Sequence, residues 1–112
     1  MEIIEGLWTA EFGSTAGRFG GGVVVFRDGR VMGGDSGYYY LGTYSLVTGN
    51  EFRATIDVVP FINGIESVFN TLGRNLKLEL TGTLTDGAHA IAQGYPVGMP
   101  GLKLGVKLAK RG

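Results

Sequence analysis

The stretch NLKLELTGTLTDG, residues 75–87, combines the two patterns that decide the fold. Over residues 75–85 leucine or glycine alternates with lysine, glutamate and threonine. A period of two is the spacing of a β-strand that has one buried and one solvent-facing side. The Asp86-Gly87 pair that follows is a strong hairpin signal, because tight hairpin turns need backbone conformations that these residue types tolerate. The stretch therefore predicts a strand over 75–85 that turns back into an antiparallel neighbour.

The same alternation extends in both directions along the chain. A second Asp-Gly pair, Asp28-Gly29, and further clusters of glycine, serine, asparagine or proline separate short segments of period two. Turn signals at such short intervals are typical of an all-β domain. The segments predict eight strands, over residues 6–13, 18–27, 30–33, 38–47, 51–59, 75–85, 88–95 and 102–110.

Eight short strands joined mostly by hairpins indicate an eight-stranded antiparallel up-and-down barrel, with a β-sandwich as the main alternative. The 112 residues suit a single domain over 1–112. Glycine fills 21 positions, against a usual share of about 7%. Several of these glycines, such as Gly42, Gly82 and Gly105, lie inside predicted strands. Glycine within strands permits the strong coiling that closes a sheet on itself, which favours the barrel.

One segment departs from this rhythm. From Phe61 to Leu72 the apolar residues follow helical spacing. Asn63 can cap a helix in which Glu66 is the third residue, and Gly73 suits the position after its end. These signals predict one short helix near residues 64–72. It is too short to be stable alone in water, so we expect it to dock over an open end of the barrel.

Composition excludes several classes of protein. Ten basic and ten acidic residues give a formal net charge of zero, so we expect no direct binding of nucleic acid. Cysteine is absent, which rules out disulfides and thiolate metal sites. The sequence has no signal-peptide pattern at its start and no apolar run near the roughly 18 residues that span a bilayer. We therefore expect a cytoplasmic location without membrane association.

Candidates for catalysis are few. The single histidine, His89, has no second histidine at metal-ligand spacing, and the glycine clusters do not fit phosphate-binding loops. We expect no catalytic residue, no metal, no cofactor and no enzymatic activity. The alternative is a hydrolytic enzyme that uses Asp35, tyrosine side chains and His89. Asp35 itself suits a turn in which its side chain accepts backbone N–H groups; in a second interpretation Asp35 and Ser36 lie at a pocket mouth.

Six aromatic residues occupy the predicted inward positions and leave two interpretations open. In the first, which we favour, they fill a packed core. In the second they line a cavity for a small apolar ligand, since an eight-stranded barrel can either fill with side chains or hold one small molecule. The small residues Ala88, Ala90, Ala92 and Gly94 on another strand are consistent with such a cavity. The candidate ligand-facing residues are Trp8, Phe12, Tyr38, Tyr40, Tyr44 and Phe52.

The outward positions of the fourth predicted strand are also apolar. Tyr39, Leu41 and Val47 fall on its outer side. An apolar patch on the surface is typical of dimer or partner interfaces. These three residues are therefore candidates for a partner-binding surface, and the neutral chain is expected to self-associate as a homodimer.

The stretch GGDSGYYYLGTY, residues 33–44, resembles the G-G-D…Y-x-G signature of GrlR-like proteins, which are negative regulators of type III secretion. The early Gly6-Leu7-Trp8 strand and residues 20–23 before Asp28-Gly29 agree with that resemblance. It implies a lipocalin-like barrel, a dimer and no catalysis. In the family an acidic run after the Y-x-G strand is linked to restraint of a transcriptional activator, and the equivalent stretch 47–51 retains one acid, Glu51.

Two functional hypotheses follow. The first is a non-enzymatic negative regulator that acts through protein–protein contacts, with a transcriptional regulator as a candidate partner. The second is a carrier or sensor of a small apolar ligand. The resemblance and the scarcity of catalytic groups favour the first, and the inward aromatic residues favour the second.

Overall fold

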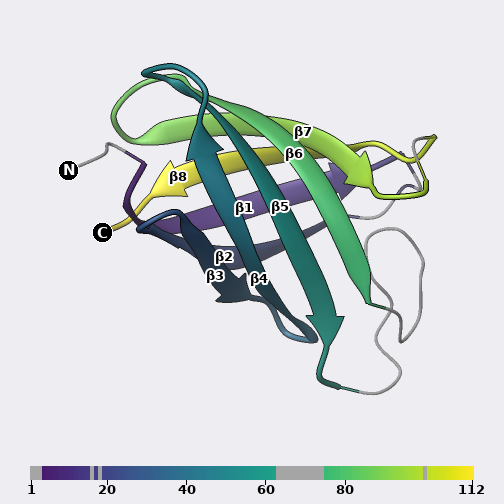
Figure 1. Ribbon diagram of the computed structural model, residues 1–112. Coiled ribbons are helices and arrows are strands. Elements are labelled where there is room, and N and C mark those ends of the chain that lie inside the picture. Colours follow the sequence, from purple (N-terminus) through teal and green to yellow (C-terminus); the bar gives the residue numbers. More distant parts are fainter. Residues whose placement is uncertain (1–3, 16, 18, 63–74, 100) are drawn as a thin grey trace.

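The computed structural model describes residues 4–15, 17, 19–62, 75–99 and 101–112 (Figure 1). Over these residues the regular structure consists of strands that close into a single barrel. The strands are β1 (Gly6–Ser14), β2 (Phe19–Arg27), β3 (Arg30–Gly34), β4 (Tyr38–Leu46), β5 (Glu51–Pro60), β6 (Leu76–Leu84), β7 (His89–Pro96) and β8 (Leu104–Lys110).

Each strand pairs antiparallel with the next one along the chain, and β1 closes the ring on β8. The predicted all-β, eight-stranded up-and-down antiparallel barrel is therefore confirmed, and the sandwich alternative is wrong. The helix predicted near residues 64–72 lies outside the described residues. No helix in the described ranges is long and apolar enough to cross a membrane.

The strand ends differ from the predicted ones by one or two residues, because local turns take up the backbone groups. The N–H of Leu102 donates to the carbonyl of Met99 (3.1 Å), so β8 begins at Leu104 and not at residue 102. The N–H of Ala88 donates to Asp86 Oδ1 (2.7 Å), so β7 begins at His89. Ala88 is therefore exposed in the turn and not on the inner wall.

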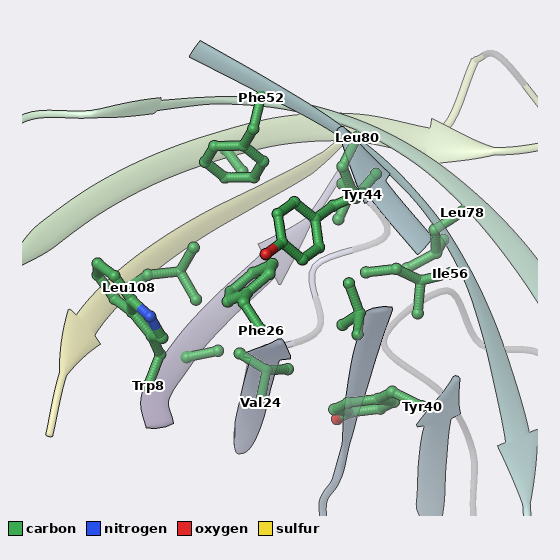
Figure 2. Packing of buried hydrophobic residues seen from close by; sticks show 14 of the residues in the cluster. Trp8, Val24, Phe26, Tyr40, Tyr44, Phe52, Ile56, Leu78, Leu80 and Leu108 are labelled. Atoms are coloured by element: carbon green, nitrogen blue, oxygen red, sulfur yellow. The ribbon is translucent and has the colours of Figure 1, made fainter. Parts of the chain in front are cut away.

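The two ends of the barrel differ in packing. We call the end that holds the β2–β3, β4–β5 and β6–β7 turns the packed end. There Phe26 makes edge-on contacts with Trp8, Tyr44 and Phe52, at centroid separations of 6.3, 5.3 and 5.8 Å (Figure 2). Trp8 Nε1 donates to the carbonyl of Ile4 (2.8 Å), so its buried polar atom is satisfied. Edge-on aromatic pairs add to the free energy gained from burial alone, so this cluster anchors the core.

Two glycines allow neighbouring strands to approach too closely for any side chain. A Cβ atom at Gly42 would lie 2.1 Å from the Thr55 carbonyl oxygen, and one at Gly94 would lie 1.8 Å from that of Glu79. At Gly82 the obstacle is a ring, since a Cβ atom would lie 2.2 Å from the nearest Phe52 ring carbon. Gly105 differs from these, because nothing lies within 4 Å of its hypothetical Cβ atom. The strand glycines therefore permit close packing at specific positions only.

We expect Gly42→Val to destabilise the barrel by about 1–3 kcal/mol or more, because the new side chain must displace the backbone of β5. Gly82→Val is expected to destabilise it as well, by displacing the Phe52 ring. The matched control is Gly105→Val, which adds the same side chain to a strand at an open position and is expected to be neutral or slightly stabilising. Urea unfolding of the variants measures these differences, and equal stabilities for Gly42→Val and Gly105→Val contradict the explanation.

Candidate ligand-binding site in the barrel interior

The end of the barrel opposite the packed end contains a cavity between the inward side chains. We call it the open end; it holds the end of β1, the start of β2 and the turn between β3 and β4. A cavity of about 260 Å³ lies inside the barrel and extends to this end. Most of the side chains that line this cavity are buried members of the hydrophobic core, so the cavity lies within a largely packed interior. The walls of the cavity are mostly apolar and include Phe12, Ile56, Val58, Leu76, Leu78, Leu104 and Val106.

The predicted aromatic residues divide between the two halves. Trp8 and Tyr44 lie in the ring cluster around Phe26 and are not part of the cavity wall. The others belong to the wall, together with Ala92 on β7 and the predicted mouth residues, and Phe52 also contacts Phe26 in the ring cluster. The cavity-lining members of the predicted set are Phe12, Tyr38, Tyr40, Phe52, Asp35 and Ser36.

The cavity reaches the surface at three residues that were not among the predicted site residues. Phe19, Gly20 and Gly21 line it at the start of β2, and all three are exposed, Phe19 by 84%. The Phe12 ring lies over Gly20, its cross-strand partner, so a side chain at that position would collide with the ring. The signal in the sequence is the run of three glycines that pairs with β1. Because glycine has no side chain, this part of β2 leaves the barrel wall uncovered.

Asp35 is fixed in the turn between β3 and β4. Its Oδ1 accepts the backbone N–H groups of Gly37 and Tyr38, both at 2.9 Å. The predicted turn, in which the Asp35 side chain accepts backbone N–H groups, is thus present. Its Oδ2 accepts the hydroxyl proton of Tyr40, an inward residue of β4. Three donors therefore hold one carboxylate at the cavity wall.

The pair of Asp35 and Tyr40 forms a polar spot in an apolar wall. Burial raises the pKa of the Tyr40 hydroxyl above its ordinary range, and the hydrogen bond to Asp35 and the charge of Asp35 raise it further. Tyr40 is therefore protonated at neutral pH and acts as the donor to Asp35. Among the described residues that line the cavity, Asp35 carries the one charged side chain.

His89 lies at the packed end, far along the barrel from Asp35. It is exposed, and its Nδ1 lies 3.0 Å from Asp86 Oδ1 in the β6–β7 turn. The Ala88 N–H and then His89 lower the pKa of the Asp86 carboxyl. Asp35 and His89 belong to turns at opposite ends, so the structure does not assemble the enzyme site that combined them. The described ranges contain no group of three histidine, aspartate or glutamate side chains that could hold a metal ion.

The outer surface carries an apolar area wider than the predicted patch. Strand register places Leu7, Val25, Met32 and Leu41 side by side on the outer surfaces of β1 to β4. Tyr39 lies in the adjacent row. We call these five residues the outer apolar face. Val47 is not part of it, because five residues lie between it and Leu41 along the chain and it lies in the β4–β5 turn.

We expect Tyr40→Phe to lower the free energy of unfolding at pH 7 by about 1–2 kcal/mol, because Asp35 Oδ2 loses a donor. The raised pKa of Tyr40 makes this difference depend on pH. The stabilisation by the Tyr40 hydroxyl is complete below about pH 10, which is the pKa of tyrosine in an unfolded chain. It is lost as the pH rises above that pKa. The gap between the two proteins is therefore expected to narrow above about pH 10.

Denaturant unfolding at several pH values measures this gap. The matched control is Tyr39→Phe, which removes the hydroxyl of a neighbouring tyrosine on the outer apolar face and is expected to change little. A gap that stays constant from pH 7 to 11 would show that Tyr40 is not held in its protonated form.

Comparisons with known proteins identify the fold. No family model matches the chain, and no curated protein matches it. A solved structure of a redesigned β-barrel is similar, with a TM-score of 0.72 and 16% sequence identity over 98% of this chain and 93% of that one. At this identity the similarity concerns the fold alone: the chain is an eight-stranded antiparallel β-barrel, similar in structure to a designed one.

Proposed function

We propose that the protein binds a small apolar molecule inside the barrel. The observation that carries this proposal is the cavity of about 260 Å³, with mostly apolar walls and a mouth at the open end. An apolar cavity of about 150 Å³ is sufficient to bind benzene. By proportion, this cavity accommodates a ligand of on the order of ten non-hydrogen atoms.

The energetic cost of such a cavity supports an occupant. Empty apolar volume in a protein interior is unfavourable, at about 24 cal/mol per Å³, because the walls lose contacts. Water compensates poorly, because a buried water molecule needs several polar partners. Small residues on three strands, Ala10, Ala54 and Ala92, border the cavity where longer side chains would fill it. A ligand that fills the space therefore gains the contacts that the walls lack.

We expect naphthalene, a neutral molecule of ten carbon atoms, to bind and to raise the unfolding temperature. Ala92→Leu adds side-chain volume at the cavity wall and is expected to weaken this binding by about tenfold or more, equivalent to about 1.4 kcal/mol. The matched control is Gln93→Leu, which places the same side chain on the adjacent, exposed position of β7. It is expected to bind naphthalene as the original protein does.

Ligand-detected NMR and thermal unfolding measure these effects, and circular dichroism checks that each variant keeps its fold. Equal naphthalene affinity in the Ala92→Leu and Gln93→Leu variants would remove the cavity from the explanation. A protein that binds no neutral probe of this size would refute the proposed function.

The outer apolar face favours a second candidate function, in which the barrel acts as a regulator through protein contacts. Met32, Leu41 and Tyr39 are 38%, 47% and 40% exposed. Contiguous apolar surface of this kind is typical of interfaces. The resemblance of residues 33–44 to GrlR-like proteins supports the same candidate, with a homodimer and a transcriptional regulator as the expected partner.

In this second candidate function the protein is a dimer, and Leu41→Lys is expected to shift it toward the monomer by placing a charge inside the interface. Thr43→Lys is the matched control, since it adds the same charge one outward position further along β4. Sedimentation velocity over a range of concentrations measures the mass. A protein that is a monomer at all concentrations, or a dimer unaffected by Leu41→Lys, would contradict this use of the outer apolar face.

A further inference from the structure

We propose that the preferred ligand carries a hydrogen-bond-donating headgroup, an amine or a hydroxyl, on its apolar body, and that this headgroup binds at Asp35 and Tyr40. The inference rests on the proposed function, since it concerns the same cavity. It goes further by naming the chemical class of the ligand and by excluding carboxylates.

The Asp35 carboxylate can accept one more hydrogen bond. A carboxylate offers about four lone-pair positions. Two backbone N–H groups and the Tyr40 hydroxyl occupy three of them. The turn fixes the orientation of the Asp35 carboxylate, so its fourth lone-pair position has a defined place at the cavity wall. This residual position accepts a hydrogen bond and cannot donate one.

Tyr40 can only accept a hydrogen bond from a ligand. Its hydroxyl proton is committed to Asp35, so the tyrosine presents oxygen lone pairs to a ligand and no free proton. Tyr40 and Asp35 together therefore form a polar spot made of acceptors. A ligand that lacks a donor leaves this spot without a partner inside a largely apolar space, which is unfavourable.

The charge of Asp35 determines which headgroup binds best. Asp35 is the one charged side chain among the described lining residues. In a wall of low polarity its negative charge attracts a protonated amine, tolerates a hydroxyl and repels a carboxylate. The expected order of affinity is therefore amine, then alcohol, then carboxylate. The turn alone does not require this arrangement, because it uses only Oδ1 and leaves Oδ2 for a side chain that borders the cavity.

The test compares four ligands that share one apolar body: 2-naphthylmethylamine, 2-naphthylmethanol, 2-naphthoate and naphthalene, each titrated at pH 7. We expect the amine to bind about tenfold or more tightly than the carboxylate, a difference of about 1.4 kcal/mol, with the alcohol between them. Asp35→Asn is expected to abolish the preference for the amine while naphthalene affinity stays unchanged. The asparagine side chain has the same shape and keeps an oxygen for the two backbone N–H groups.

Two further variants separate the site from general effects. Asp57→Asn removes the same charge from an exposed residue of β5, where Asp57 faces Lys77, and is expected to leave all four affinities unchanged. Tyr40→Phe removes the acceptor oxygen beside Asp35 but keeps the Asp35 charge, so it is expected to reduce the preference for the amine without abolishing it. Naphthoate binding as tightly as the amine, or an amine preference that survives Asp35→Asn, overturns the inference while the proposed function stands. Absence of binding for all four ligands overturns both.

Discussion

Pairing of β1 with β8 is the constraint on which the rest of this structure depends. Seven residue pairs, from Trp8 with Lys110 to Ser14 with Leu104, convert an open meander into a closed surface with an inside. Closure requires strongly coiled strands, and coiled strands bring backbones together at particular points. The glycines at Gly42 and Gly94 allow that approach. Once the ring is closed, every inward side chain has a fixed height along the barrel.

The distribution of aromatic side chains along the barrel then determines where the cavity lies. Three aromatic residues, Trp8, Tyr44 and Phe52, pack around Phe26 at one end. Farther along, the small residues Ala10, Ala54 and Ala92 border the cavity on three strands, and the Phe12 ring lies over Gly20. The same eight strands therefore enclose a packed end and an end that contains the cavity, because side-chain volume is unevenly divided between them.

Local patterns predicted the strands and the Asp35 turn, because both depend on residues close in sequence. The alternation of leucines over 75–85 defines the inner face of β6 without reference to any other strand. The cavity depends on the sum of side-chain volumes from all eight strands, which no local pattern contains. The outer apolar face depends on the register of Leu7 against Met32 through β2. The Tyr40 partner of Asp35 required both the turn and the inward direction of β4, each predicted separately but not combined.

In the ligand-binding function that we propose, the apolar walls and the polar spot at Asp35 contribute differently to binding. Burial of the ligand body supplies affinity roughly in proportion to area, about 25 cal/mol per Å², and this term barely distinguishes one hydrocarbon shape from another. Selectivity has to come from a group that can be left unsatisfied, because an unpaired buried polar group is costly. Three protein donors already hold the Asp35 carboxylate, so a ligand headgroup meets an ordered acceptor and the ordering cost of binding is small. In this proposal the turn that shapes the β3–β4 connection also determines which headgroups the cavity accepts.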